Sequence, residues 1–195
     1  EYATELIAAL SHLIINTNDN IGFFFFSDAI SNYIEPGRGM KHFYFFVDLL
    51  TNTSNYGGKS DFNMALAFAM EYFPKNVDSV IIVSDFLSVN RETEKRLSLF
   101  SSLFDTTLIQ IRDPLDITLP DIQGEIALED PETHQQILIN PKIAKASYEA
   151  YARERQLLFK SVITKTKADF LELTTNKPFA EPLAIFLKER GENYT

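Results

Sequence analysis

Two hydrophobic patterns alternate along the chain, and each predicts a different kind of element. Apolar residues at helical spacing, such as Leu6, Leu10 and Leu13 in the first segment, predict helices. The segments that we expect to be helical are residues 2–16, 40–50, 61–73, 91–104, 141–165 and 181–190. Pro141 stands in the first turn of the fifth of these, a position where proline is favoured.

Short apolar runs lie between these segments and predict strands. They are residues 21–26, 77–83, 107–111 and 170–173, with a shorter extended piece at 29–34. The run Ile21–Phe26 is apolar on both faces, which is typical of a central strand in a parallel sheet. Strands that alternate with helices predict an α/β fold, with a mostly parallel, Rossmann-like sheet that has helices on both faces.

A small antiparallel hairpin interrupts this alternation. Residues 125–128 and 136–139 are short alternating runs, and the sequence Asp130-Pro131-Glu132-Thr133 between them is typical of a turn. The chain contains no internal repeat, no low-complexity segment and no linker that would divide it. We therefore expect residues 1–195 to form a single domain, with the hairpin as a decoration.

Composition narrows the functional classes. The formal net charge of −9 argues against nonspecific nucleic-acid binding, which needs a basic surface. The absence of cysteine excludes disulfides, thiolate nucleophiles and cysteine-ligated metals. No apolar run is long enough to span a bilayer, so we expect a cytoplasmic segment, although a membrane anchor upstream is compatible with it. The chain opens at Glu1 directly into a helical pattern, and we expect it to be a fragment of a longer protein.

Candidate chemistry lies where the strands end, because ligands of open parallel sheets bind beyond the carboxyl ends of the strands. Three strand ends carry polar residues, Ser27-Asp28, Ser84-Asp85 and Asp113, and the loop 57–61 leads to the same edge. Asp85 is the sharpest candidate, because a carboxylate at the mouth of a buried strand is costly unless it is paired, hydrated or bound to a cation. With the hydroxyl of Ser60 it makes an oxygen pair that suits Mg²⁺. The alternative is that Asp85 caps a turn and Ser60 caps the next helix.

Other catalytic motifs are absent. The sequence Gly57-Gly58-Lys59-Ser60 is not a phosphate-binding loop. Such a loop needs a glycine five positions before Gly58, and Thr53 stands there. Ser84 has no flanking glycines of the hydrolase type. The three histidines, His12, His42 and His134, have no partner at ligand spacing.

A set of short motifs runs through the chain in a defined order. They are Ile21-Gly22-Phe23 with Phe26-Ser27, the run 33–39, Gly58-Lys59-Ser60-Asp61-Phe62 with Ala65-Leu66, Val80 to Val83 with Ser84-Asp85-Phe86, Asp113-Pro114 with Leu119-Pro120, the run 124–128, Asp130-Pro131-Glu132-Thr133, and Tyr148. In this order they resemble the von Willebrand factor A-like family known as domain of unknown function 58. The resemblance covers nearly the whole chain.

The resemblance implies a Rossmann-like sheet with a site like the metal-ion-dependent adhesion site. Asp85 matches the aspartate that follows the fourth strand of that fold, and Ser60 stands where a threonine is usual, which keeps the hydroxyl. The remaining part, an Asp-x-Ser-x-Ser motif after the first strand, has no counterpart here. The resemblance thus implies a domain without its first, central strand, and Mg²⁺ binding that depends on residues outside this chain.

Three functions follow from these observations. The first is a binding module without enzymatic activity, in which a cation on Ser60 and Asp85 contacts a protein partner. The resemblance implies a MoxR-type AAA+ ATPase as that partner, in the assembly or maturation of complexes. The second is a metal-free scaffold domain. The third is a phosphoacceptor or metal-dependent α/β enzyme that uses Asp85, for which the sequence shows no supporting acidic pair.

Overall fold

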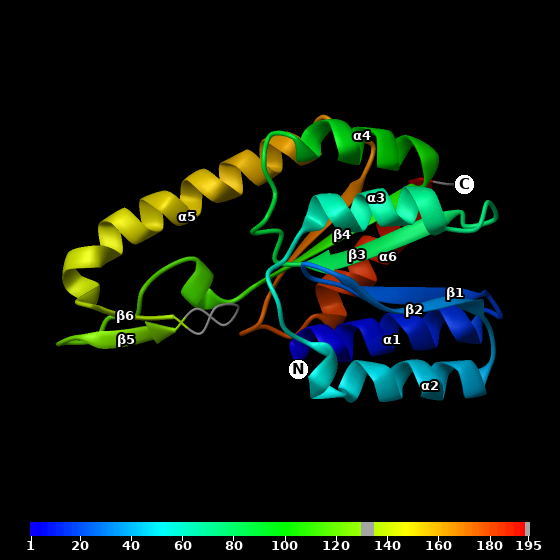
Figure 1. Cartoon of the computed structure of the whole chain (residues 1–195), viewed down its shortest axis with the longest axis horizontal. Helices are drawn as coiled ribbons and strands as arrows, with labels where there is room; N and C mark the ends of the chain where they lie inside the picture. The colour runs from blue at the N-terminus through cyan, green and yellow to red at the C-terminus, as the bar shows by residue number, and fades with distance from the viewer. Residues whose placement is uncertain (130–134, 194–195) are drawn as a thin grey trace. The chain divides into compact units, whose positions relative to one another are not determined.

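The computed structural model describes residues 1–129 and 135–193 (Figure 1). The predicted turn Asp130-Pro131-Glu132-Thr133 lies outside the described residues. The chain divides into two compact units, residues 1–72 and residues 73–195, and each is described by itself. The expectation of a single domain over residues 1–195 stays a prediction.

The first unit combines helices with a two-stranded hairpin. Its elements are α1 (Tyr2–Asn16), β1 (Ile21–Phe26), β2 (Ile30–Gly37), α2 (Met40–Thr51), the 3-10 turn η1 (Thr53–Asn55) and α3 (Phe62–Tyr72). The three helices confirm the predicted segments to within one or two residues. The strand β2 reaches further than the extended piece predicted at 29–34, because its pairing with β1 continues to Gly37.

The direction of β1 corrects one prediction. The run Ile21–Phe26 is not a central parallel strand, because it pairs with β2 in antiparallel fashion. A tight turn joins the two strands, with the Ser27 amide donating to the Ala29 carbonyl at 2.9 Å. A parallel connection needs a crossover of a dozen residues or more, and the turn leaves no room for one.

The apolar residues on both faces of β1 nevertheless pack against helices. Phe23 packs against Phe46 of α2, with ring centroids 4.1 Å apart, and Phe24 packs against Phe68 of α3 at 5.1 Å. Neighbouring residues of a strand point to opposite faces, so α2 and α3 cover opposite sides of this hairpin. A strand that is covered on both sides has a continuous apolar sequence, whether its partner is parallel or antiparallel.

The second unit contains the predicted parallel sheet. Its elements are β3 (Ser79–Ser84), α4 (Thr93–Leu103), β4 (Asp105–Arg112), the 3-10 turn η2 (Pro114–Asp116), β5 (Ile126–Glu129), β6 (Gln136–Ile139), α5 (Pro141–Ile163), β7 (Asp169–Thr174) and α6 (Ala180–Asn193). The strands β3, β4 and β7 are parallel, with β4 in the centre. The strands β5 and β6 form the predicted antiparallel hairpin. The fold class, α/β with a Rossmann-like parallel sheet, is confirmed.

Helices cover both faces of this sheet, and the side chains of β4 show which helix covers which face. Gln110 contacts α5 through Gln156, whereas Thr107 contacts α6 through Arg190. The two β4 residues are three positions apart, so they point to opposite faces. The helices α5 and α6 therefore lie on opposite sides of the sheet, with Leu108 and Ile109 fully buried between them.

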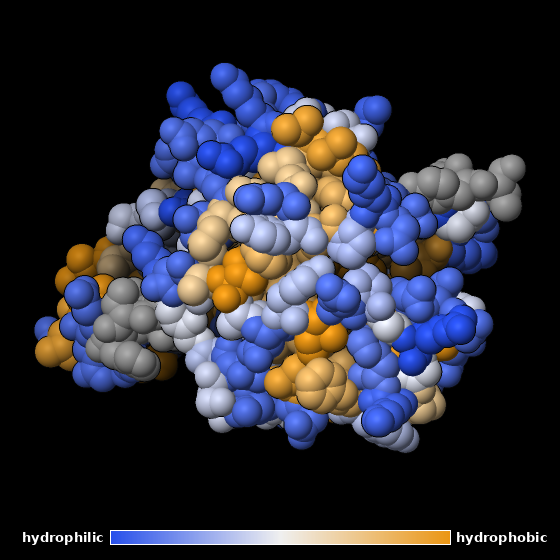
Figure 2. All heavy atoms as spheres, turned by 45° about the vertical axis from the view of Figure 1, so that its right-hand side comes forward, coloured by the Kyte–Doolittle hydropathy of each residue, from blue (hydrophilic) through white to orange (hydrophobic). Residues whose placement is uncertain are grey.

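Aromatic residues pack the α5 side of the sheet. Phe159 of α5 stacks on Phe86 with ring centroids 4.8 Å apart, and it meets Phe170 of β7 edge-on at 5.5 Å. Figure 2 shows hydrophobic residues gathered in several patches, which hydrophilic residues separate, on the face that it draws. Among the described residues, no helix has both the length and the apolar character needed to cross a membrane.

Candidate functional site

Asp85 lies immediately after β3, at the carboxyl end of the parallel sheet, and is half-buried. Its Oδ1 atom accepts a hydrogen bond from the Leu87 amide at 3.0 Å, and the Ser84 hydroxyl donates to the same oxygen at 3.4 Å. Phe86 between them has a positive φ of 58°, so the chain turns sharply here. Asp85 therefore caps this turn, as one of its two sequence interpretations predicts. Its Oδ2 atom accepts no hydrogen bond from the residues that the structure describes.

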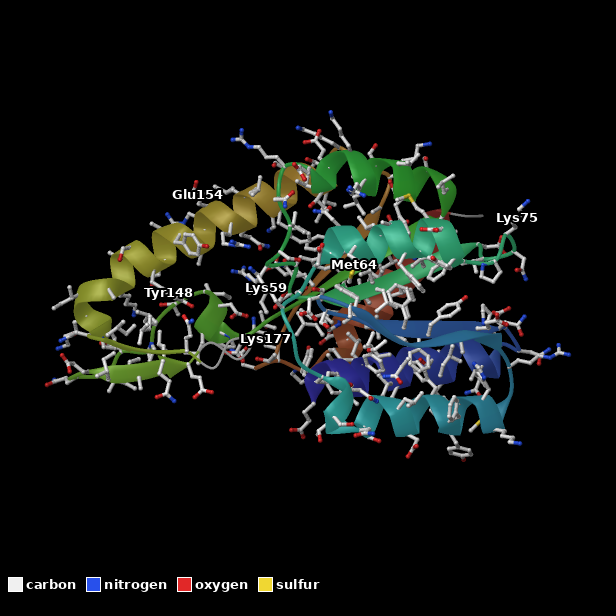
Figure 3. The ribbon with its side chains drawn as sticks, in the orientation of Figure 1. Lys59, Met64, Lys75, Tyr148, Glu154 and Lys177 are labelled. Atoms are coloured by element: carbon white, nitrogen blue, oxygen red, sulfur yellow. The ribbon has the colours of Figure 1, made fainter. Side chains whose placement is uncertain are left out.

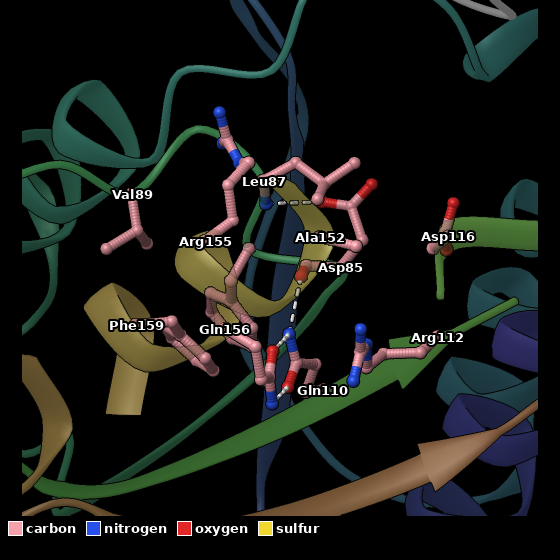
Figure 4. A pocket seen from close by; sticks show the side chains of 11 residues that line it. Asp85, Leu87, Val89, Gln110, Arg112, Asp116, Ala152, Arg155, Gln156 and Phe159 are labelled. Atoms are coloured by element: carbon pink, nitrogen blue, oxygen red, sulfur yellow. Dashed lines mark hydrogen bonds between the residues drawn. The ribbon is translucent and has the colours of Figure 1, made fainter. Parts of the chain in front are cut away.

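A pair of glutamine side chains fixes the backbone of Asp85. The Nε2 atom of Gln110 donates to the Asp85 carbonyl at 2.9 Å, and the Gln110 and Gln156 amides donate to each other at 3.2 and 2.9 Å (Figure 4). Gln110 is only 3% exposed, and these bonds are partly buried. Buried amides that satisfy one another hold a single arrangement. The strand end is therefore a rigid platform.

A small pocket opens beside this platform. It has room for about 30 Å³, and its polar lining residues are Asp85, Gln110, Arg112, Asp116, Arg155 and Gln156. Pockets for metabolites or nucleotides are typically about 300–1,000 Å³ in volume. In this conformation the pocket therefore accepts an ion or a group of a few heavy atoms, and no larger ligand.

The third predicted strand end, Asp113, is occupied by local hydrogen bonds. Its Oδ1 accepts from the Leu115 amide at 2.9 Å, and its Oδ2 accepts from the Thr175 hydroxyl at 2.8 Å. Asp116 accepts from the Asp113 amide at 2.8 Å, which completes a capping box around η2. Asp113 thus joins β4 to the end of β7, and its carboxylate has a structural task.

Asp116 lines the pocket, and its surroundings disfavour the charged form of its carboxyl group. Burial raises the pKa of its carboxyl group above the ordinary value, although the hydrogen bond from the Asp113 amide opposes this. The charges of Asp85 and Asp113 raise the Asp116 pKa further, while Arg112 lowers it. Tyr148 of α5, whose hydroxyl donates to the Leu115 carbonyl at 2.6 Å, holds η2 in place (Figure 3). Its own pKa is raised by burial and by the charge of Asp116.

Ser60 belongs to the first unit, in the loop that precedes α3. The next residue, Asp61, donates its amide to the Ser27 carbonyl at 3.0 Å, so this loop meets the end of β1. Gly58 is required there, because its φ is 84° and a Cβ atom would lie 2.8 Å from an Asp28 oxygen. Asp61 caps α3 by accepting from the Met64 amide at 3.0 Å, where one sequence interpretation expected Ser60 to do so.

The predicted metal pair is therefore divided between the two units. Ser60 is a half-buried loop residue of the first, and Asp85 is a rim residue of the second, so their joint role in a cation site stays a prediction. Across residues 1–129 and 135–193, no group of three or more His, Asp or Glu side chains is placed to hold a metal ion. The oxygen donors at the Asp85 rim are of the kind that Mg²⁺ prefers.

Sequence reasoning missed five polar residues of the pocket, namely Gln110, Arg112, Asp116, Arg155 and Gln156. Gln110 gave one usable signal, because an amide side chain inside the predicted strand 107–111 needs a buried partner. Gln156 and Arg155 gave none, since they stand in a helix with many charged residues. Their shared position is set by the packing of α5 on the sheet.

A parallel sheet between helices, with a polar rim at its strand ends, defines a Rossmann-like α/β protein. The model of the family described as "Protein of unknown function DUF58" matches residues 1–157, and the chain belongs to this family. The resemblance of the sequence motifs to domain of unknown function 58 is thereby confirmed. Among curated proteins, none matches the chain.

Two solved structures share the fold. One is the conserved hypothetical protein BatB from Bacteroides thetaiotaomicron, at 9% identity and a TM-score of 0.58, covering 98% of this chain and 89% of that protein. The other is an aerotolerance-related membrane protein from Bacteroides fragilis with multiple mutations to serine, at 12% identity and a TM-score of 0.58, covering 95% of this chain and 85% of that protein. At these identities the likeness concerns the fold alone.

Proposed function

We propose that this protein is a non-enzymatic interaction module that binds a protein partner at the rim formed by the ends of β3 and β4. A divalent cation, Mg²⁺, binds Asp85 and bridges to the partner. The observation that carries this proposal is the arrangement of Asp85, whose Oδ1 caps the turn while its Oδ2 is left to a ligand beside a small pocket.

The rigidity of the rim supports recognition of a macromolecule. The backbone of Asp85 is held by Gln110, and the carboxylate of Asp113 is held by Thr175. A surface whose buried polar groups are already bonded loses little conformational entropy when a partner binds. The pocket is too small for a metabolite, so its ligand is a side chain of the partner and not a small-molecule substrate.

The partner that we propose is a MoxR-type AAA+ ATPase in the cytoplasm, a role that follows from the family resemblance of the motifs. The net charge of −9 supports a contact bridged by a cation, because an acidic surface attracts divalent ions. The resemblance also assigns Ser60 as a second oxygen ligand.

A metal-free scaffold is the second candidate. It is favoured by the capping bonds of Asp85, which give the carboxylate a structural reason to be there without any ion. In this case the same rim binds its partner by shape and by direct hydrogen bonds alone.

Calorimetric titration of the full-length protein with Mg²⁺ and Mn²⁺ separates the two candidates. Asp85→Asn removes the charge and keeps an oxygen that accepts from the Leu87 amide, so folding is preserved. We expect saturable binding that Asp85→Asn weakens by roughly 10-fold or more, with unfolding free energy changed by less than about 0.5 kcal/mol. Asp121→Asn, at an exposed aspartate, is the matched control.

Capture of a purified MoxR-type ATPase tests the partner. Binding that EDTA and Asp85→Asn both abolish supports the cation-bridged module. Full binding in EDTA overturns the cation and favours the metal-free scaffold, and no binding under either condition overturns the ATPase as the partner.

A further inference from the structure

Arg112 lies at the edge of the pocket, and the charge of its guanidinium group is only weakly neutralised. It is the last residue of β4, and its side chain is only 13% exposed. Among the described residues, Glu172 is the one carboxylate within 4.0 Å, at 3.4 Å from Nη1. Charge-assisted hydrogen bonds between arginine and carboxylate are usually about 2.7–2.9 Å long. The contact is therefore weak for a charge so far withdrawn from water.

Glu172 cannot fully neutralise Arg112, because it is shared. Its Oε2 atom accepts from Gln156 at 3.1 Å and lies 3.2 Å from the Nζ atom of Lys160. One carboxylate thus serves two cations and an amide. A guanidinium has five N–H donors, and a single long bond to the described residues leaves most of them for a ligand.

The surroundings of Arg112 favour an anionic group in the pocket. Its guanidinium points toward the paired Gln110 and Gln156 amides (Figure 4), and Arg155 of α5 lines the same pocket. Arg155 donates to the Tyr151 hydroxyl at 3.0 Å and lies over the Tyr151 ring, so it brings a second positive charge without a carboxylate partner among the described residues.

We infer that this pocket binds a carboxylate group of the protein partner, with Arg112 as the recognition residue and Arg155 as an auxiliary cation. The inference rests on the proposed function in that the ligand belongs to a protein. A carboxylate matches the planar fork of a guanidinium with two parallel hydrogen bonds. It also matches a pocket with room for about 30 Å³.

The acidic residues of the pocket select against more strongly charged anions. Asp85 and Asp116 line the same pocket and repel a dianion such as a phosphate more than they repel a single carboxylate. A cation on Asp85 would reduce this repulsion, so Mg²⁺ strengthens carboxylate binding without being required for it.

The test is a titration of the full-length protein, labelled with ¹⁵N-arginine, while the Nε–Hε resonance of Arg112 is followed. Three short capped peptides serve as probes. One carries a glutamate side chain and an amidated end, one carries only glycine and a free terminal carboxylate, and one carries glutamine and an amidated end. Each titration is run in EDTA and again in Mg²⁺.

We expect saturable shifts of the Arg112 resonance with a carboxylate peptide and none with the glutamine peptide. The stronger of the two carboxylate probes identifies the source, a side chain or a chain terminus. Arg112→Lys keeps the charge but not the fork, and it should weaken binding roughly 10-fold. The control Arg153→Gln, at an exposed arginine of α5, should leave binding unchanged. Equal shifts with the glutamine peptide, or carboxylate binding that Arg112→Lys leaves intact, overturn the inference.

The titrations in EDTA and in Mg²⁺ distinguish a failure of this inference from a failure of the proposed function. Binding that depends on Arg112 and is identical in EDTA and Mg²⁺ supports the carboxylate site and contradicts the cation at Asp85. Normal Mg²⁺ binding with no carboxylate shift contradicts the carboxylate site and leaves the cation rim standing.

Discussion

An arginine lies among aspartates at each end of the parallel sheet in the second unit. The two arginines differ in how closely carboxylates oppose their charge. At the amino end, Nη2 of Arg190 lies 2.7 Å from both oxygens of Asp105. Its Nε lies 2.8 Å from an Asp169 oxygen, close enough for an ion pair although not aligned as a hydrogen bond. At the carboxyl end, Arg112 has one contact of 3.4 Å.

The difference separates a structural charge from one available for binding. Arg190 joins α6 to the first residues of β4 and β7, and its charge is opposed by two carboxylates. Arg112 is less exposed than either of those carboxylates, yet it shares one acceptor with Lys160. We therefore assign a structural role to Arg190, whose two carboxylates lie 2.7 and 2.8 Å away, and a binding role to Arg112.

The largest effect is expected at the amino end. Arg190→Leu leaves Asp105 and Asp169 without their cation and should lower the free energy of unfolding by about 2 kcal/mol, a value reduced because both carboxylates are partly exposed. Urea denaturation at pH 7 measures it. Lys188→Ala, at a residue of α6 that is 78% exposed, should change stability by less than about 0.5 kcal/mol. Equal losses for both variants would refute the structural assignment of Arg190.

A smaller effect is expected for the glutamine pair. Gln110→Leu leaves the Asp85 carbonyl and the Gln156 amide without their buried partner, and should cost about 1–2 kcal/mol. Because the two amides bond to each other, adding Gln156→Leu should cost less than the sum of the single changes. A double-mutant cycle by urea denaturation measures this coupling. Strict additivity would mean that the pair does not act as a unit.

The smallest effect concerns pH, and it involves Asp116. The pKa of Asp116 is raised in the folded protein, so the folded state binds the proton more tightly than the unfolded chain does. The contribution of Asp116 to stability is therefore present below its unfolded pKa and is lost as the pH rises through its folded pKa. Asp116→Asn should remove this loss, and its stability advantage over the wild type should be greater at pH 7 than at pH 4.

Urea denaturation at both pH values tests this prediction. Asp121→Asn, at an exposed position, provides the matched control. An advantage of Asp116→Asn that is the same at pH 4 and pH 7 would show that repulsion and burial do not act on this carboxyl group.

Much of the fold could be predicted from local patterns. The six helices and the strands of the parallel sheet appear where periodicity places them, within a few residues at their ends. The hairpin β5–β6 follows from two alternating runs around a turn sequence. The exception is β1, where the run of phenylalanines indicated correctly that both faces are covered but could not indicate the direction of the partner strand, which the short turn to β2 decides.

The candidate site was predicted less completely. Asp85 and Asp113 could be found because strand ends are marked in the sequence by polar residues after apolar runs. Arg155 and Gln156 could not, because a helix with charges on several faces does not reveal which side chain will meet a pocket. The loop that holds Ser60 meets the end of β1, and Asp61, the neighbour of Ser60, caps α3.

The sequence by itself determined the order of helices and strands, the parallel sheet and the polar strand ends, because these depend on periodicity and on the local chemistry of turns. It also determined the family, since the motifs occur in a defined order. The tertiary structure alone decided that Arg190 is paired with two carboxylates at short distance, whereas Arg112 has one longer contact with the shared Glu172. The charge balance of a side chain depends on residues distant in the chain, such as Asp105 and Glu172, and only the packing of helices on a sheet brings them together.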